Sequence, residues 1–357
     1  MKQPFEAIHV SRAPEFLEYL SPDGPIFGTK PLHTFSSGNG NPTWVFRGQA
    51  DATHTLLPSA IRKGQALLLR GGWKALADQI SNGDQAGAEF SSLLAFFWAA
   101  DEHGLTIPED SQTLRTFFDP SGNALAALRE QKGAWLPDFL LSLAALAQHY
   151  GLPTRLLDWS YNPLVAAYFA ASSQESHADN LCVWALDLSA LGLVQRSRKA
   201  QGFLRFVSAP RSSNVNLLAQ DGLFTMYTPE PFDWDAARVA TPIEDIIRSW
   251  VGVRNTPILF RISLIRAEAE NLRSLLLRRG ITGAKIFPGY AGVLKALRER
   301  GPWGSSWGYQ HDVEIPAYDP SLFSDETKAL RSTERLQPAK SSGQRNRGQR
   351  SGKQRPG

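Results

Sequence analysis

Hydrophobic residues recur at helical spacing in the first half of the chain and alternate with polar residues in the second half. Phe90, Leu94 and Trp98 fall on one helical stripe and predict a helical region over residues 73–100. The alternation over residues 258–262 predicts a strand. Because helices concentrate early and strands late, the pattern favours an α+β fold, with a helical N-terminal half packed on a mainly antiparallel β core.

The clearest helix pattern lies in the centre of the chain. Apolar residues recur on one stripe over residues 139–150. Gly151 is predicted to end this helix, and Pro153 prevents its resumption. After a short apolar stretch, Asn162-Pro163 is typical of a helix start, with asparagine as the N-cap and proline in the first turn.

The pattern also predicts further strands and helices. Strands are expected at Trp44–Arg47, Leu181–Leu188, Leu223–Tyr227, Ile258–Leu264 and Val313–Ala317, and helices at residues 114–131, Ala267–Arg279 and Val293–Arg300. Arg47 is followed at once by Gly48, although glycine weakens a strand unless something approaches its backbone. This pair is therefore a candidate for contact with a ligand.

Composition indicates a folded protein without disulfides. The chain has 357 residues, of which 42% are hydrophobic, and its single cysteine, Cys182, excludes a disulfide framework and a Cys-rich metal site. No signal peptide is visible, and the longest apolar runs, at residues 92–100 and 139–147, are about half of the roughly 18 residues that a membrane-spanning helix needs. We expect a soluble, cytoplasmic protein without a membrane partner.

Charge is distributed unevenly along the chain. Residues 331–357 contain eight basic residues and one acid, so they carry +7 in a chain of net charge +4, and the remainder carries −3. This region is rich in Gly, Ser, Gln and Pro, and we expect a disordered basic tail over residues 321–357. Two interpretations stay open: contact with nucleic acid or an acidic partner, and a solubilising extension.

Polar residues gather around the connection between the two central helices. The N-terminus of the helix at Pro163 would offer free N–H groups to a phosphate or carboxylate, and Arg155 would add a forked donor to the same anion. Asp158 could accept from a ribose hydroxyl. Each residue also has a structural interpretation. His149 would be stabilised by the dipole at the C-terminus of its helix, and Ser160 would cap the following helix. Arg155 and Asp158 would form an internal ion pair.

Other chemical motifs are weak or absent. Gln220 is predicted to begin a strand, where Gly222 permits a bulge or the close approach of a ligand. The sequence contains no dinucleotide-binding glycine motif, P-loop, zinc-protease motif or nucleophile elbow. No two of the seven histidines have metal-ligand spacing on one element, so no metal site is expected.

Two longer motifs resemble the FRG domain family, which is named for its Phe-Arg-Gly triplet. The triplet here is Phe46-Arg47-Gly48, which lies within residues 44–51 and is followed by residues 56–59 and Arg62. The central signature of the family is resembled by residues 147–160, Asn162-Pro163 and residues 166–170. Later family motifs are resembled by residues 220–225 and 286–288. The resemblance implies an FRG domain over residues 25–320, with its core at 25–300, after an N-terminal segment at 1–24.

A second similarity is to ADP-ribosyltransferases of the Arg-Ser-Glu class, which carry an arginine on an early strand, a serine motif before a helix and a glutamate on a later strand. Arg47 and Ser160 are similar to the first two features, whereas the third position holds Gln220, and Glu314 is another candidate carboxylate. This similarity implies an ADP-ribosyltransferase-like fold with NAD as substrate. Arg47 would hold the pyrophosphate, Ser160 would position the nicotinamide ribose, and a carboxylate would polarise its hydroxyl.

These features favour two functions over a third. One is an NAD-dependent ADP-ribosyltransferase-like enzyme acting as a toxin or defence effector; the other is a non-catalytic module for a nucleotide or small anion, with a tail that contacts nucleic acid. A hydrolase or nuclease in the same pocket is a third. Candidate catalytic residues are Arg47, His149, Asp158, Ser160 and Gln220, and candidate ligand-binding residues are Gly48, Gln49, Gln148, Thr154, Arg155, Trp159 and Asn162. We expect Arg47, His149, Arg155, Asp158 and Gln220 to converge on one cleft.

Overall fold

The computed structural model describes residues 5–27, 44–69, 73–119, 122–172, 178–196, 202–211, 214–251 and 257–299. All of them belong to one compact unit, Met1–Ser305, and the second unit is Ser306–Gly357. The predicted strand at Val313–Ala317, the candidate carboxylate Glu314 and the basic tail therefore lie outside the described residues.

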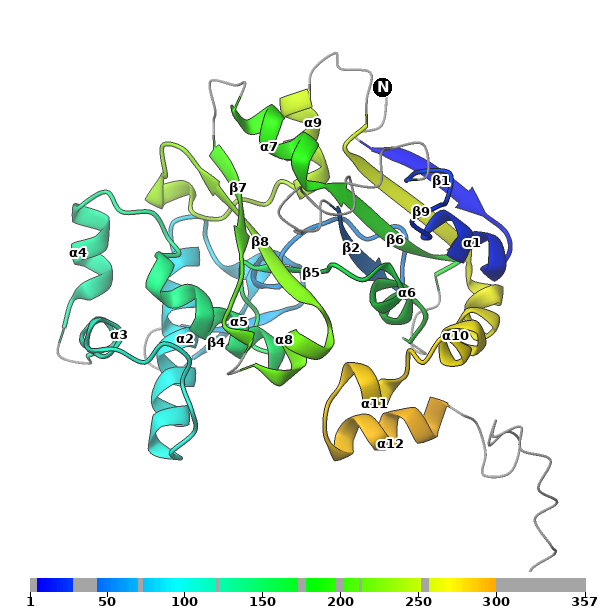
Figure 1. Cartoon of the computed structure of the whole chain (residues 1–357). Coiled ribbons are helices and arrows are strands. Elements are labelled where there is room, and N and C mark those ends of the chain that lie inside the picture. The colour runs from blue at the N-terminus through cyan, green and yellow to red at the C-terminus, as the bar shows by residue number, and fades with distance from the viewer. Residues whose placement is uncertain are drawn as a thin grey trace, which may run out of the picture. The chain divides into compact units, whose positions relative to one another are not determined.

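A mixed, mostly antiparallel sheet of seven strands organises the described residues (Figure 1). Its order is β1 (Glu6–Val10), β9 (Leu259–Ile265), β6 (Asn180–Asp187), β2 (Trp44–Gln49), β5 (Leu157–Ser160), β8 (Gly222–Pro229) and β7 (Gly202–Val207). β1 and β9 pair in parallel, and every other neighbouring pair is antiparallel. The predicted α+β class and the mainly antiparallel core are confirmed.

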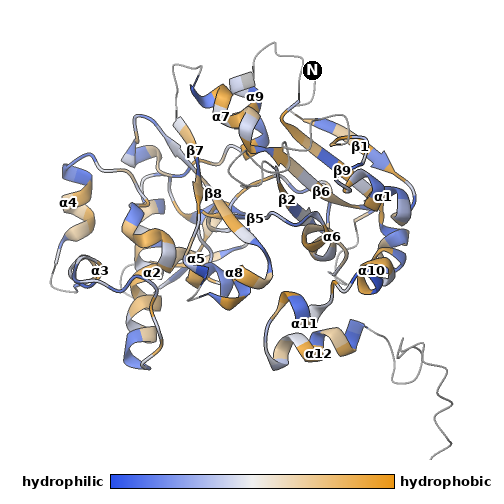
Figure 2. Ribbon diagram, viewed as in Figure 1, coloured by the Kyte–Doolittle hydropathy of each residue, from blue (hydrophilic) through white to orange (hydrophobic). Residues whose placement is uncertain are grey.

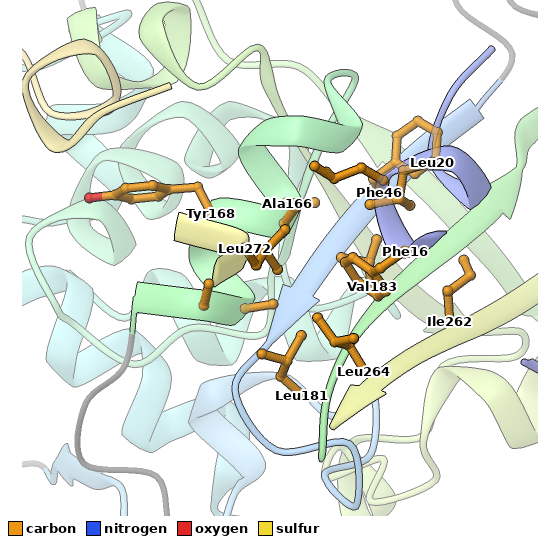
Figure 3. Close-up of a cluster of buried hydrophobic side chains, with 14 of the residues drawn as sticks. Phe16, Leu20, Phe46, Ala166, Tyr168, Leu181, Val183, Ile262, Leu264 and Leu272 are labelled. Atoms are coloured by element: carbon orange, nitrogen blue, oxygen red, sulfur yellow. The ribbon is translucent and has the colours of Figure 1, made fainter. Parts of the chain in front are cut away.

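One face of the sheet is covered by three helices: α1 (Ala13–Tyr19), α6 (Pro163–Ser172) and α10 (Ala269–Arg278). In Figure 3, Phe46 of β2 and Val183 of β6 lie among side chains from these helices. This buried cluster forms because the central strands carry apolar residues on alternate positions and the helices present apolar stripes toward them.

The opposite face buries a second cluster against α7 (Leu188–Arg196) and α9 (Ile243–Val251), with Trp159 and Trp184 among its members. A third cluster joins β7 and β8 to a helical layer. That layer consists of α2 (Gln85–Glu102), α3 (Gln112–Phe117), α4 (Ala124–Glu130) and α5 (Leu141–His149). The remaining elements are the hairpin β3 (Ala66–Leu68) and β4 (Lys74–Leu76), α8 (Val215–Ala219), α11 (Gly283–Ile286), α12 (Tyr290–Glu299), and 3-10 turns at Ser59–Ile61, Ala77–Gln79, Asp138–Leu140, Trp234–Ala236 and Arg266–Glu268.

Two of the predicted helices were wrong in extent. The region at residues 73–100 begins with a strand and a 3-10 turn, and its helix starts only at Gln85. The helix predicted over residues 114–131 is two helices, since Pro120 and Gly122 lie between them and proline cannot continue a helix. Within the described residues, no helix is both long and apolar enough to cross a membrane.

Candidate functional site

Arg47 and Asp158 form the centre of the candidate site. Arg47 lies on β2, and its Nη1 donates to the carbonyl oxygen of Asp158 on β5 at 2.8 Å. The same nitrogen is 2.6 Å from Oδ1 of Asp158. β2 and β5 are paired at one position, Phe46 with Ser160. The Arg47 side chain therefore bonds to the β5 backbone where the two strands are no longer paired. Arg47 is only 8% exposed, whereas the Asp158 side chain is 59% exposed. The Asp158 carboxylate therefore faces solvent, while the guanidinium that holds it is buried.

The end of α5 and the loop after it complete the polar surroundings of Asp158. Nε2 of Gln148 donates to Oδ1 of Asp158 at 3.3 Å, and the Thr154 hydroxyl donates to Oε1 of Gln148. Ser59 fixes this loop, because its Oγ accepts from the Thr154 amide at 3.1 Å and donates to the Thr154 carbonyl at 3.2 Å. Gln148, Thr154 and Asp158 are therefore joined in one chain of hydrogen bonds beside Arg47.

A second guanidinium, that of Arg62, lies close to this pair. It is half-buried, and its Nε donates to the carbonyl of Leu57 at 2.7 Å. Burial and then the charge of Arg47 lower the pKa of Arg62, while Asp158 partly offsets them. Neighbouring side chains remove part of the water around the Asp158 carboxylate and so act to raise its pKa, but Arg47 and the charge of Arg62 outweigh this effect and hold that pKa below the usual range. Arg47 is paired with Asp158, and the charge of Arg62 acts on both groups, so these three side chains together carry one surplus positive charge.

Gly48 serves the packing of helix α6 on the sheet. A Cβ at this position would lie 1.8 Å from the carbonyl oxygen of Ala166 and 2.7 Å from the amide nitrogen of Ala170. The interpretation that a ligand approaches the backbone here is therefore wrong: the backbone of α6 makes the approach. The glycine of the Phe-Arg-Gly triplet fixes the distance between β2 and α6.

Arg155 belongs to a different, fully buried network. Its Nε and Nη2 bond to the two carboxylate oxygens of Glu89 on α2, at 2.6 and 3.0 Å, and its Nη1 donates to the carbonyl of Trp135 at 3.0 Å. Nε1 of Trp135 and Nε2 of Gln85 also donate to Glu89, each at 2.8 Å. The proposed pairing with Asp158 and the proposed donation to a ligand are both corrected, because a bidentate buried partner occupies this guanidinium.

The start of α6 is closed to a ligand as well. The Ser160 hydroxyl donates to the carbonyl of Gln220 at 2.7 Å and accepts from the amide of Asn162 at 2.9 Å. Oδ1 of Asn162 accepts from the Leu164 amide at 3.0 Å, which confirms its predicted role as N-cap. The Asn162 carbonyl accepts from the amides of Val165 and Ala166. Since these amides are satisfied internally, the expected phosphate site at this helix N-terminus is wrong.

Most of the residues described above lie in a part of the chain that matches a known family. Residues 42–179 match the model of the FRG domain. The chain carries an FRG domain. The match contains every predicted site residue except Gln220 and Glu314. No curated protein and no solved structure matches the chain.

Within the FRG domain, Gln49 and Trp159 support the site from the apolar core. Oε1 of Gln49 accepts from Nε1 of Trp184 at 2.7 Å, and its Nε2 donates to the carbonyl of Thr55 at 3.4 Å. Nε1 of Trp159 donates to Oγ1 of Thr225 at 2.9 Å. Both side chains are buried, so they hold the strands around Arg47 in place and are not exposed to a ligand.

His149 packs on Tyr150, and Gln220 bonds to Ser160 and Ile286. The half-buried His149 packs edge-on to Tyr150, with ring centroids 5.2 Å apart, and burial lowers the pKa of His149. Gln220 is bound through its carbonyl to Ser160, and its Nε2 donates to the carbonyl of Ile286 at 3.3 Å. The predicted convergence is therefore partial: Arg47 and Asp158 meet directly, and Arg155 is diverted to Glu89.

Sequence reasoning did not assign a role to Arg62, although this residue stands in the first FRG motif. The signal available was its position directly after residues 56–59, which fold back over the central motif through Ser59 and Thr154. Within the described part of the chain, no group of three or more His, Cys, Asp or Glu residues is arranged to hold a metal ion. What the site offers chemically is two guanidinium groups and an exposed carboxylate.

Proposed function

We propose that the FRG domain of this chain binds a phosphate-bearing ligand of the nucleotide class at Arg47, Arg62 and Asp158. The observation that carries the proposal is the unequal charge of the site: Asp158 is paired with Arg47, and the guanidinium of Arg62, which acts electrostatically on both, has no carboxylate of its own among the described ion pairs. A ligand phosphate would neutralise the surplus charge and form charge-assisted hydrogen bonds with the guanidinium groups.

The hydrogen-bonding capacity of the site agrees with such a ligand. Nε of Arg47 is buried and has no hydrogen-bond partner among the described residues, so it is a donor without an acceptor. The Asp158 carboxylate is open to solvent and acts only as an acceptor while ionised. Phosphate on the arginines and a sugar hydroxyl on Asp158 would use both kinds of group, which is why we favour a nucleotide over a simple inorganic anion.

The test is isothermal titration calorimetry of the full chain with ADP-ribose, NAD and pyrophosphate. We expect ADP-ribose to bind, and Arg62→Gln to weaken it at least tenfold, about 1.4 kcal/mol. The matched control is Arg205→Gln, since Arg205 also pairs with an aspartate, Asp138, but lies on β7. If none of the three compounds binds the wild-type chain at millimolar concentration, or if both variants bind equally well, the proposal fails.

A second candidate function, ADP-ribosyl transfer from NAD, is favoured by the order of the strands. Arg47 lies on β2 and Ser160 on the neighbouring strand β5, and Gln220 follows α8 two residues before the next strand, β8. In such a reaction the bond from ribose C1′ to nicotinamide breaks, nicotinamide leaves, and an acceptor nucleophile takes the ADP-ribose. Asp158 is the described carboxylate nearest to Arg47 and would stabilise the positive charge that develops at the ribose.

The two candidate functions are separated by incubating the chain and its Asp158→Asn variant with labelled NAD and a cell extract. Transfer of label by the wild-type chain and its loss in the variant would support the enzyme. Binding of NAD without any transfer would leave the binding module as the function.

A further inference from the structure

A cavity of about 810 Å³ opens between helices α2 and α4, and none of Arg47, Arg62 and Asp158 lines it. Its walls come from one stripe of α2, from the β3–β4 hairpin, from α4 and from the loop that carries Trp234. Its volume lies within the range of roughly 300–1,000 Å³ that is typical of small-molecule sites in proteins.

The walls of this cavity are apolar surfaces that no other part of the described chain covers fully. Phe90, Leu94 and Trp98 are one helical turn apart on α2, line the cavity and are only partly buried. Across from them, α4 has no buried residue although it begins Ala-Leu-Ala-Ala-Leu, and hydrophobic residues make up most of this helix in Figure 2. Leu125 faces the cavity from α4.

The aromatic walls make no hydrogen-bonding demand on an occupant. Nε1 of Trp98 donates to the carbonyl of Phe118 at 2.9 Å, and Nε1 of Trp234 donates to the carbonyl of Gly133 at 3.0 Å. Since both indole N–H groups are already satisfied, the two rings offer apolar faces to whatever enters.

The charges at the cavity wall favour one kind of polar end on the occupant. Among the described lining residues, the charged ones are two acids, Asp84 and Asp119, and one base, Arg129. Arg129 is also paired with Asp235, with Nη2 2.5 Å from Oδ1. The described lining therefore carries one more acid than base, which disfavours an anionic ligand such as a fatty acid.

We propose that this cavity is a second binding site, for a lipophilic small molecule whose polar end is neutral or positively charged. This site takes the opposite charge preference from the arginine site, and the proposal does not depend on nucleotide binding there. Gly87 provides a variant that closes the cavity: it lines the wall within α2, and a Cβ built on it meets no atom within 4 Å. A phenylalanine at this position would extend into the open space.

The experiment titrates the full chain with Nile red, a neutral lipophilic dye, followed by displacement with dodecylamine or dodecanoate below their micelle concentrations. We expect saturable dye binding, at least tenfold weaker binding to Gly87→Phe, and displacement at least fivefold more effective with dodecylamine than with dodecanoate. The matched control is Gly192→Phe on α7, another helical glycine whose Cβ would have a single neighbour, at 3.8 Å.

Circular dichroism spectra and melting temperatures of both variants establish that they fold. Wild-type dye binding that Gly87→Phe leaves unchanged, or that Gly192→Phe weakens equally, would overturn the site. Equal or better displacement by dodecanoate would overturn the charge preference. Absence of saturable dye binding to the wild-type chain would overturn the proposal as a whole.

Discussion

Arg47 and Asp158 are 111 positions apart in the sequence, and Nη1 of Arg47 lies 2.6 Å from Oδ1 of Asp158 while also bonding to its carbonyl oxygen. This contact joins the Phe-Arg-Gly triplet to the central motif of the FRG domain. Ser59 and Thr154 add a second junction between the same two regions. The two motifs are therefore parts of a single structural unit, and the separation between them in the chain is filled by the helical layer.

The buried pair of Arg155 and Glu89 is predicted to stabilise the fold strongly. Arg155→Ala leaves the buried Glu89 carboxylate without its cationic partner and the Trp135 carbonyl without its donor, so we expect the free energy of unfolding to fall by about 3–5 kcal/mol. Urea denaturation measures this change. Arg205→Ala, which breaks the exposed pair with Asp138, should cost less than about 1 kcal/mol. Equal losses in the two variants would contradict the assignment of Arg155 as a structural residue.

Gly48 is predicted to tolerate no side chain. In Gly48→Ala, the new methyl group would meet the backbone of Ala166 and Ala170, so we expect a loss of more than about 3 kcal/mol in the free energy of unfolding, or an insoluble product. Gly87→Ala, in open space within α2, should instead raise that free energy by about 0.5–1 kcal/mol. A Gly48→Ala chain as stable as the wild type would show that β2 and α6 are not in this contact.

Asp158 and Glu244 are predicted to change stability with pH in opposite directions. The pKa of Asp158 is lowered in the fold. Its contribution to the free energy of unfolding is therefore present above the ordinary carboxyl pKa of about 4 and is lost as the pH falls through the pKa of the folded state. Burial raises the pKa of Glu244, so its contribution is present below the ordinary value and is lost as the pH rises through the folded one.

Denaturation curves of Asp158→Asn and Glu244→Gln between pH 3 and pH 7 test this pair of predictions. Relative to the wild type, Asp158→Asn should be less stable at pH 7 than at pH 3. Glu244→Gln should gain relative stability over the same rise in pH, with one of the Leu56 amide contacts retained by its side-chain oxygen. The same direction of change in both variants would show that the charges around Arg47 and Arg62 do not control Asp158.

Much of the secondary structure could be predicted from the sequence because it depends on local patterns. The alternation in residues 258–262 and the Asn162-Pro163 start of α6 are examples, and both were confirmed. The helix expected at residues 73–100 was wrong at its start, because Lys74–Leu76 form β4 and pair with β3, a contact that the local pattern does not specify.

The site could be predicted only in part, because its interpretation depends on partners distant in the sequence. Asp158 is the nearer candidate partner for Arg155 along the chain, whereas the actual partner, Glu89, lies 66 residues away. Gly48 similarly indicated a close approach, but the sequence does not say whether a ligand or a helix makes it. Arg62 carries no signal of its own, since its importance comes from the charge of Arg47 beside it.

Nitrogen-15 arginine NMR of the full chain during titration with ADP-ribose tests the central claim most directly. The Nε–Hε signals of Arg47, Arg62 and Arg155 are assigned by single Arg→Lys variants. We predict that the signals of Arg47 and Arg62 move in a saturable way while that of Arg155, held by Glu89, stays in place. Saturable binding that leaves Arg47 and Arg62 unmoved, or that moves Arg155 instead, would contradict a phosphate site built on the Phe-Arg-Gly arginine.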